Sequence, residues 1–211
     1  MTPSSDNIVG LMAKYPKIGE VKTRLAASVG DEAALRVYRA LLANVVSQIV
    51  GVKDRSYSIG CFVTPVDMVD PFRSKYPCFD FYSSQADGDL GARMSAALSE
   101  LVEVHGAKKA VLIGADIPQL SREHVQQAFA ALDKSDVVWG PTDDGGYYLI
   151  GIKVVHRSLF HDIRWGTHGV LEQSVEAAEK SDLGVCLLES LSDLDDENDL
   201  RRFEAMIEFN F

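Results

Sequence analysis

The sequence predicts an α/β fold in which helices cover both faces of a mostly parallel, mixed β-sheet. Short apolar runs alternate with longer amphipathic segments along the chain. Continuous apolar runs are typical of strands buried on both faces, which need a layer of helices on each side. Two of the later runs lie close together around a turn rich in glycine and aspartate, which indicates an antiparallel element. No linker rich in proline, glycine or serine interrupts the pattern, so we expect a single domain over residues 1–211.

In the first half of the chain, the predicted elements are bounded by local signals. Gly30 and Asp31 form a start signal for the first helix, and Thr64-Pro65 ends the second strand. The helix has apolar residues three and four positions apart, whereas each predicted strand is an apolar run too short for a helix. The expected elements are a strand at 8–13, a polar loop at 14–23, a helix at 31–49, a strand at 57–63, a helix at 66–75 and a strand at 78–82.

The second half of the chain repeats this alternation. Gly106 is expected to end one helix as its C-terminal cap, and Ser121 to begin the next as its N-terminal cap. The expected elements are a loop at 85–91, a helix over 94–102, a strand at 110–113, a helix over 121–132, strands at 136–139 and 147–152, a helix over 167–178, a strand at 183–188, and a last helix that begins at Asp196 or Asn198 and includes Met206 and Ile207.

Composition and charge narrow the class of partner. Lys and Arg number 21 against 31 Asp and Glu, giving a formal net charge of −10. A net negative charge opposes nonspecific binding to nucleic acid or to anionic lipid, because binding to either one requires a cationic face on the protein. The three cysteines form no CxxC pair, which disfavours a disulfide framework or a zinc cluster. The sequence shows neither a signal peptide nor a run of about 18 apolar residues, so we expect a cytoplasmic protein without a membrane span.

Cationic side chains follow the first predicted strand. Ligands of open α/β sheets bind outside the carboxyl ends of the strands, and Lys14, Lys17, Lys22 and Arg24 lie there in an otherwise acidic chain. Arginine binds phosphate as a two-pronged fork and lysine as a point charge, so the loop suits phosphate or pyrophosphate. A solvated basic loop would have the same composition. The GxxxxGK[ST] and GxGxxG motifs are absent, which disfavours the P-loop and dinucleotide-binding classes.

Carboxylates follow two later elements. Asp116 comes directly after the strand at 110–113, where it could bind Mg²⁺ or Mn²⁺ or could form a turn or helix cap. Asp193 and Asp195 would lie on the same side of an extended chain and could supply a second metal contact. Aspartates are equally common in the first turn of a helix. Together with the cationic loop, these acids predict a site for a metal ion and phosphate.

The turn GPTDDGG offers a third group of polar residues. Asp143 and Asp144 could accept hydrogen bonds from sugar hydroxyls, and Gly145 and Gly146 permit close approach of the backbone to a ligand. The alternative is a simple hairpin turn, for which Asp-Gly is a common signal.

Six motifs occur in order along the chain: KYPKIGEVKTRLA, QADGDLGARM, GADIPQL, GPTDDGGYYLIG, DIRWGT and DLDDENDL. In this order they resemble a bacterial family of nucleotide-diphospho-sugar transferases, many of them described as glycosyltransferases. More distantly, the chain is similar to 2-phospholactate guanylyltransferase and to molybdenum-cofactor guanylyltransferases. The resemblance covers nearly the whole chain. It implies the GT-A type of nucleotide-binding fold and a transferase, dependent on Mg²⁺ or Mn²⁺, that uses a nucleotide donor and a small-molecule acceptor.

The resemblance also implies a role for each matching position. Asp116, Lys22 and Arg24 would be the catalytic residues. Nucleotide and phosphate would be bound by Lys14, Lys22, Arg24, Gln85, Gly88, Gly91 and Arg93. The metal would be held by Asp116 with Asp193 or Asp195, and the sugar or acceptor would contact Asp143, Asp144, Gly145, Gly146 and Trp165.

Two departures from the related enzymes leave the reaction open. The first loop lacks the GxGTRMxP-like signature of classical nucleotidyltransferases, and GADIP has one acid where many glycosyltransferases have a DXD pair. The donor is therefore an NTP or an NDP-sugar, and the transferred group nucleotidyl or glycosyl. The alternative function is a nucleotide-binding regulatory module without turnover. A homo-oligomer is compatible with the sequence.

Overall fold

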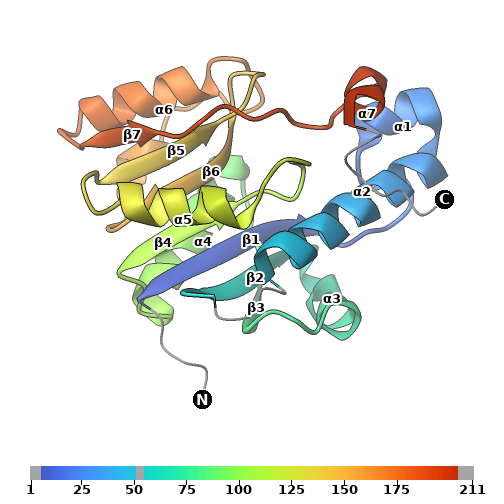
Figure 1. Ribbon diagram of the computed structural model, residues 1–211, viewed down its shortest axis with the longest axis horizontal. Helices are drawn as coiled ribbons and strands as arrows, with labels where there is room; N and C mark the ends of the chain where they lie inside the picture. The colour runs from blue at the N-terminus through green and yellow to red at the C-terminus, as the bar shows by residue number, and fades with distance from the viewer. Residues whose placement is uncertain (1–5, 51–54, 204–211) are drawn as a thin grey trace.

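The structure is a computed structural model that describes residues 6–50 and 55–203, in which a seven-stranded sheet lies between two layers of helices (Figure 1). The strand order is β3-β2-β1-β4-β6-β5-β7. All strand pairs are parallel except those that β6 makes with β4 and β5. The strands are β1 (Asn7–Lys14), β2 (Ser58–Thr64), β3 (Phe81–Ser84), β4 (Lys109–Ile113), β5 (Val137–Pro141), β6 (Tyr147–Ile152) and β7 (Val185–Leu187). The predicted mixed, mostly parallel α/β sheet is confirmed.

The helices divide between the two faces of the sheet. Buried side chains of α2, α3 and α5 pack on one face, and those of α4 and α6 pack on the other. A π-helical segment, Val46–Val50, continues α2, and a second, Glu100–Val104, continues α4. The helices are α1 (Thr23–Val29), α2 (Asp31–Val45), α3 (Val69–Lys75), α4 (Leu90–Ser99), α5 (Arg122–Ala131), α6 (Val170–Glu179) and α7 (Glu197–Phe203), with 3-10 turns at Val66–Met68 and Arg157–Phe160.

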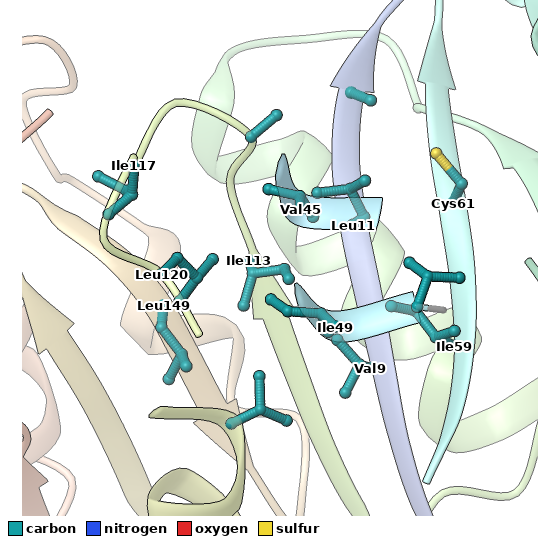
Figure 2. Packing of buried hydrophobic residues seen from close by; sticks show 14 of the residues in the cluster. Val9, Leu11, Val45, Ile49, Ile59, Cys61, Ile113, Ile117, Leu120 and Leu149 are labelled. Carbon is teal, nitrogen blue, oxygen red and sulfur yellow. The ribbon is translucent and has the colours of Figure 1, made fainter. Parts of the chain in front are cut away.

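The larger core cluster lies between α2 and the central strands. Figure 2 shows Val45 and Ile49 beside Leu11 of β1, with neighbouring side chains of β2 and β4 around them. The central strands are buried on both faces, as their continuous apolar sequences predict. Because these strands are fixed by packing on both sides, the loops at their carboxyl ends start from fixed positions.

A smaller cluster outside the sheet joins α1, α2 and α7. Leu25 of α1, Leu41 of α2 and Phe203 of α7 are all buried in it. Figure 1 shows the segment after β7 running across the molecule to α7, which lies beside α1. This arrangement places the acidic segment before α7 next to the cationic loop after β1.

Three elements differ from the prediction. The helix expected from Thr167 begins only at Val170, because Gly169 is its N-cap and the Thr167 hydroxyl donates to the carbonyl of Arg164. Helix α1 was not expected, because its sequence has no capping residue; its N-cap Lys22 has a left-handed backbone with φ 48°. β3 begins later than the expected strand at 78–82, because Asp80 accepts a hydrogen bond from the backbone of Ile59 before the ladder starts. The final helix is confirmed to begin near Asp196, whereas Met206 and Ile207 lie outside the described residues.

One helical stretch, Asp31–Val50, is long and apolar enough to cross a membrane by length and composition alone. It is α2 with its π-helical extension, and half of its most apolar window is buried inside the structure. Core helices of globular proteins satisfy the same criterion, so this feature carries no argument for a membrane span.

Candidate active-site cleft

A cleft opens at the carboxyl ends of β1 and β4, the neighbouring parallel strands at the centre of the sheet. It has two lobes of about 470 and 500 Å³. The first lobe is lined by residues that include Lys14, Lys22, Tyr38, Thr64, Gln85 and Arg93. The second lobe is lined by residues that include Arg24, Thr142, Asp144, Trp165, His168 and Asp195. Asp116, Asp193, Tyr147, Leu90 and Met94 border both lobes, so the two form one continuous cleft.

Lys22 links the predicted cationic and acidic groups. Only 5% of its side chain is exposed, and its Nζ lies 3.1 Å from Asp116 Oδ1 and 3.0 Å from Asp195 Oδ1. Arg24 Nη1 lies 3.3 Å from Asp195 Oδ2. Burial disfavours the charged ammonium, but the two carboxylates outweigh this effect and raise the pKa of Lys22. Residues from the start, middle and end of the chain therefore meet at one point.

The segment before α7 directs alternate carboxylates into the cleft. Leu194 is fully buried, and its backbone N–H donates to the carbonyl of Asp116. Asp193 and Asp195, on either side of it, both line the cleft, as the alternation predicted. Burial, together with the neighbouring carboxylates of Asp144, Asp195 and Asp116, raises the pKa of Asp193 to about 7. The site thus has more negative than positive charge close to Asp193.

The next aspartates in this segment are structural. Asp196 Oδ1 accepts hydrogen bonds from the backbone of Asn198 and Asp199, and Asp199 Oδ2 accepts from the backbone of Asp195 and Asp196. These bonds cap the first turn of α7, where four backbone N–H groups lack helical partners. Both predicted roles of these aspartates therefore occur: Asp193 and Asp195 line the cleft, whereas Asp196 and Asp199 cap α7.

The donor set of the cleft fits a divalent cation that is shared with a phosphate ligand. Within the described part of the chain, no group of three or more His, Cys, Asp or Glu residues is arranged to hold a metal by itself. Mg²⁺, however, commonly uses one or two carboxylates together with substrate phosphates. Asp116 Oδ1 is buried and contacts Lys22 without receiving an aligned hydrogen bond from the described residues, and around Asp193 three neighbouring carboxylates outnumber the single ammonium of Lys22. Both oxygens of Asp195 already contact Lys22 and Arg24, so Asp116 with Asp193 is the better-suited pair.

The GPTDDGG turn places its two aspartates differently. Asp144 Oδ1 accepts hydrogen bonds from Thr142 Oγ1 at 2.6 Å and from the Gly146 N–H at 3.0 Å, and the residue lines the second lobe. Asp143 instead accepts from the hydroxyls of Ser190 and Ser192, which lower the pKa of its carboxyl. Asp143 and Gly145 are not among the described residues that line the cleft, whereas Gly146 is.

Gly145 fixes this turn against the segment that carries Trp165. Its φ is +88°, and a Cβ atom there would lie 1.9 Å from the backbone oxygen of His168. His168 Nδ1 lies 2.7 Å from the backbone oxygen of Asp144. The turn and the segment over residues 165–168 therefore form one wall of the second lobe.

The loop at 85–91 borders the first lobe at its start and supports the second lobe at its end. Gln85 Nε2 donates to the carbonyls of Ala13 and Phe62 at the ends of β1 and β2. Arg93 also lines the first lobe, with its Nε donating to the Gly88 carbonyl at 3.0 Å. Gly91 lies beneath Trp165, since a Cβ there would be 2.5 Å from the indole Nε1. Gly88 and Gly91 are absent from the described lining of both lobes.

Several lining residues were missed by the sequence analysis, among them Tyr38, His168 and Thr64. The hydroxyl of Tyr38 donates to the carbonyl of Lys14 and accepts from its N–H, which fixes the end of β1. Tyr38 lies within the helix predicted at 31–49, and no local signal distinguishes it as a residue of the cleft. His168 and Thr64 also border the cleft, and neither lies in a motif that separates a site residue from a loop residue.

The order of this sheet and the position of its cleft define an α/β protein of the nucleotide-diphospho-sugar transferase fold. Over residues 56–167 the sequence matches the model of a family described as "Uncharacterized protein conserved in bacteria (DUF2064)", and the chain belongs to this family. None of the curated proteins matches the sequence.

Solved structures share this fold over nearly the whole chain. A protein of Desulfovibrio desulfuricans G20 described as a "putative nucleotide-diphospho-sugar transferase" is 28% identical, with a TM-score of 0.83 and 96% of each chain covered. The 4-diphosphocytidyl-2C-methyl-D-erythritol synthase of Anaerococcus prevotii DSM 20548 is 12% identical, with a TM-score of 0.61 over 96% of this chain and 98% of that one. Rv0371c of Mycobacterium tuberculosis H37Rv, solved in complex with manganese, is 15% identical, with a TM-score of 0.53 over 95% and 99% of the two chains.

Proposed function

We propose that the protein is a transferase that binds a nucleotide donor, an NTP or an NDP-sugar, together with Mg²⁺ or Mn²⁺, and transfers a nucleotidyl or glycosyl group to a small-molecule acceptor. One observation carries this proposal: Lys22 Nζ lies within 3.1 Å of Asp116 and Asp195 at the junction of two lobes. The names of the similar structures, which include a sugar transferase and a diphosphocytidyl synthase, support a nucleotide donor.

The first lobe suits the donor. Its volume of about 470 Å³ lies in the range of small-molecule sites, and it opens at the carboxyl ends of the central strands. Lys14 at its edge and Lys22 at its junction with the second lobe would pair with the donor phosphates, and Arg24 would reach them from the second lobe. Gln85 and Arg93, at the other side of the first lobe, would contact the base.

The chemistry requires charge stabilisation more than a protein nucleophile. Displacement at phosphorus or at an anomeric carbon builds negative charge on a pyrophosphate-type leaving group. Lys22 and Arg24 would neutralise part of this charge from fixed positions, which is effective because they need no reorganisation during the reaction. Asp116 and Asp193 would hold the divalent ion, which when bound offsets further charge on the leaving group. The manganese complex of Rv0371c is consistent with this choice of ion.

An assay with a panel of donors tests the proposal. NTPs and NDP-sugars are incubated with Mn²⁺ and a mixture of acceptors; release of pyrophosphate identifies nucleotidyl transfer, and release of a nucleoside diphosphate identifies glycosyl transfer. Asp116→Asn should lower turnover by roughly 10²–10³-fold, the usual effect of removing one fixed charge partner. Asp70→Asn is the matched control, because Asp70 is an exposed carboxylate on α3.

The same assay distinguishes the proposed transferase from the alternative, a nucleotide-binding regulatory module without turnover. Lys22 contacts both Asp116 and Asp195, an arrangement that also suits a nucleotide-binding regulatory module. Tight nucleotide binding by the wild-type protein without any product would support this module. Near-normal turnover of Asp116→Asn would contradict the role assigned to Asp116.

A further inference from the structure

The proposed reaction needs a group that accepts a proton. The acceptor hydroxyl must lose its proton as its oxygen displaces the pyrophosphate-type leaving group. The proposed function gives Asp116 and Asp193 to the divalent ion, and both oxygens of Asp195 contact Lys22 and Arg24. These groups serve the ion and the leaving group, so the proton requires a different acceptor in the cleft.

The imidazole ring of His168 lines the second lobe with one nitrogen already engaged. Its Nδ1 lies 2.7 Å from the backbone oxygen of Asp144. Because a carbonyl oxygen only accepts hydrogen bonds, Nδ1 must be the donor and carry a proton. In the neutral ring Nε2 then has no proton and offers a lone pair. Within the described part of the chain, Nε2 has no hydrogen-bond partner.

The GPTDDGG turn holds this ring through a carbonyl that is itself fixed. The Asp144 side chain accepts two hydrogen bonds from within the turn. The next residue, Gly145, packs so closely that a Cβ there would lie 1.9 Å from the His168 backbone oxygen. The Leu171 N–H donates to the Gly145 carbonyl at 2.9 Å. A base oriented by a third group in this way is the arrangement that catalytic sites use to control proton transfer.

Gln173 of α6 braces the segment that carries His168. Its Nε2 donates to the Gly169 carbonyl at 2.7 Å, and its Oε1 accepts from the Arg164 N–H at 3.1 Å. The Thr167 hydroxyl donates to the Arg164 carbonyl at 2.8 Å. Proton transfer requires a base that is held within hydrogen-bonding reach of the substrate, and these contacts restrain the backbone on both sides of the histidine.

From this geometry we infer that His168 is the general base of the proposed transferase. Nε2 accepts the proton of the acceptor hydroxyl while the hydroxyl oxygen bonds to the phosphorus or the anomeric carbon of the donor. The bond from that atom to the leaving-group oxygen breaks, and the leaving group departs with the electron pair. The proton stays on the imidazolium until the product leaves. The inference rests on the proposed function, because donor and acceptor have to meet in the cleft.

The charged groups around the ring are compatible with this role. The titratable residues that line the lobe with His168 are Arg24, Asp116, Asp144, Tyr147, Asp193 and Asp195. No described Lys or Arg forms an ion pair with Asp144, and an unpaired carboxylate nearby favours the imidazolium that forms. A free imidazole has a pKa of about 6.5, so it is better matched than a carboxylate to proton transfer near neutral pH.

NMR of the histidine rings tests the tautomer without any need for turnover. Protein labelled with ¹⁵N-histidine shows which ring nitrogen carries the proton, and His168→Asn identifies the signals of His168 among the five histidines. At pH 8 we expect the proton on Nδ1, because this atom donates to the Asp144 carbonyl. A proton on Nε2 would overturn the inference.

The same variant tests the effect on turnover. The amide of an asparagine side chain can still donate to the Asp144 carbonyl, but it has no basic nitrogen. With the panel of NTPs and NDP-sugars, Mn²⁺ and the acceptor mixture, His168→Asn should lower kcat by roughly 10²–10⁴-fold, the usual contribution of a general base. Thermal stabilisation by the same nucleotide with Mn²⁺ should be unchanged, because donor binding does not use His168.

His161→Asn is the matched control. His161 is an exposed histidine paired with Asp162, and it is absent from the described lining of both lobes. Its replacement should leave turnover at the wild-type level. An equal loss in both histidine variants would overturn the specific role of His168.

The pH dependence separates a base from a residue that only ties the turn in place. Measured from pH 6 to pH 9, the deficit of His168→Asn should be largest near neutrality and should shrink at higher pH, where hydroxide takes the proton instead. A constant deficit at every pH would show a structural role and overturn the inference. His168→Asn keeps every other titratable residue of the lobe, so their contributions cancel in the ratio of the two rates.

The outcomes for the two proposals differ. Wild-type turnover together with near-normal turnover of His168→Asn would overturn the role of His168 and leave the proposed function intact. A wild-type protein that binds none of the donors and forms no product would contradict the proposed function, and the base would be rejected with it. Donor binding without product would support the regulatory module and would equally reject a base.

Discussion

Lys22 is the residue on which the geometry of the cleft most depends. Its ammonium is almost completely buried between two carboxylates that are each about half exposed. Lys22→Gln should reduce turnover by roughly 10²–10³-fold, because a fixed positive charge at the leaving group is lost. It should also lower the free energy of unfolding by about 2 kcal/mol, since Asp116 and Asp195 lose their buried partner.

Steady-state kinetics and urea unfolding measure these two effects. Lys17→Gln is the matched control for stability, because Lys17 lies in the same loop but is exposed and pairs with the exposed Glu20. A stability loss as large in Lys17→Gln as in Lys22→Gln would show that the loop, and not the buried ion pair, is responsible.

Asp193 should make stability depend on pH. Its pKa rises from 3.8 to about 7 on folding, mainly through burial and then through neighbouring carboxylates. Between these values the folded chain holds a proton that the unfolded chain has lost, so this group lowers stability as pH increases from about 4 to about 7. Asp193→Asn should therefore be about as stable as the wild type near pH 4 and about 4 kcal/mol more stable near pH 8.

Thermal or urea unfolding of both proteins across this pH range gives the comparison, without added divalent cations. A stability difference that stays constant with pH would show that the folded-state pKa of Asp193 is not raised. Mn²⁺ should reduce the difference near pH 8, because a cation offsets the carboxylates that disfavour the charged form.

At the residue scale, sequence patterns predicted which groups meet but not which of two neighbours faces the ligand. Lys22, Arg24, Asp116 and Asp195 do converge, because all of them follow strands or cross the carboxyl edge of the sheet. Asp143 and Asp144 are adjacent and chemically identical, yet Ser190 and Ser192 bind the first, and the second lines the cleft. The two serines come from a distant segment, so no local pattern could separate the two acids.

At the scale of elements, the second lobe depends on contact between the GPTDDGG turn and the segment over residues 165–168. Gly145→Ala should break this contact, because its Cβ would overlap the backbone of His168 and its φ of +88° is unfavourable for alanine. We expect a loss of about 2–4 kcal/mol in the free energy of unfolding and weaker ligand binding in the second lobe.

Gly106→Ala is the matched control for Gly145→Ala. Its φ is +74°, but a Cβ there would meet no heavy atom within 4 Å. Gly106→Ala should lower the free energy of unfolding by only about 1 kcal/mol, the cost of the backbone strain alone. Equal losses of stability in the two variants, measured by urea unfolding, would mean that the overlap with His168 is unimportant.

Elements with strong local signals were predicted well, and those fixed by tertiary contacts were not. β1, β4 and α2 match their predicted ranges closely, because continuous apolar runs and helical periodicity are local properties. α1 has seven residues and no side-chain cap, and it is held by Leu25 in the cluster with α2 and α7. Short helices are marginal by themselves, so its sequence alone resembled a loop.

For the whole molecule, the strand order determines which parts of the chain share the cleft. β1 pairs with β4, although almost a hundred residues separate them along the chain, and the segment before α7 is joined to the loop after β4 by the Leu194–Asp116 backbone bond. The alternation of elements predicts a mixed sheet, but it does not specify which strands are neighbours. The junction of Lys22 with Asp116 and Asp195 therefore follows from long-range packing that no single segment encodes.

Because the cleft joins both ends of the chain to its centre, its ligand should stabilise the whole fold. A nucleotide donor that binds only the folded state, at about 100 times its dissociation constant, should add about 2.7 kcal/mol to the free energy of unfolding. The gain should require a divalent ion, because the donor phosphates and the carboxylates of Asp116 and Asp193 repel each other without one. Thermal unfolding with each NTP and NDP-sugar, with and without Mn²⁺, measures the effect. EDTA should abolish the gain in the wild-type protein, and Lys22→Gln should reduce it. Equal stabilisation in Mn²⁺ and in EDTA would show that Lys22 and Arg24 alone compensate the donor phosphates, and would remove the metal from the proposed mechanism.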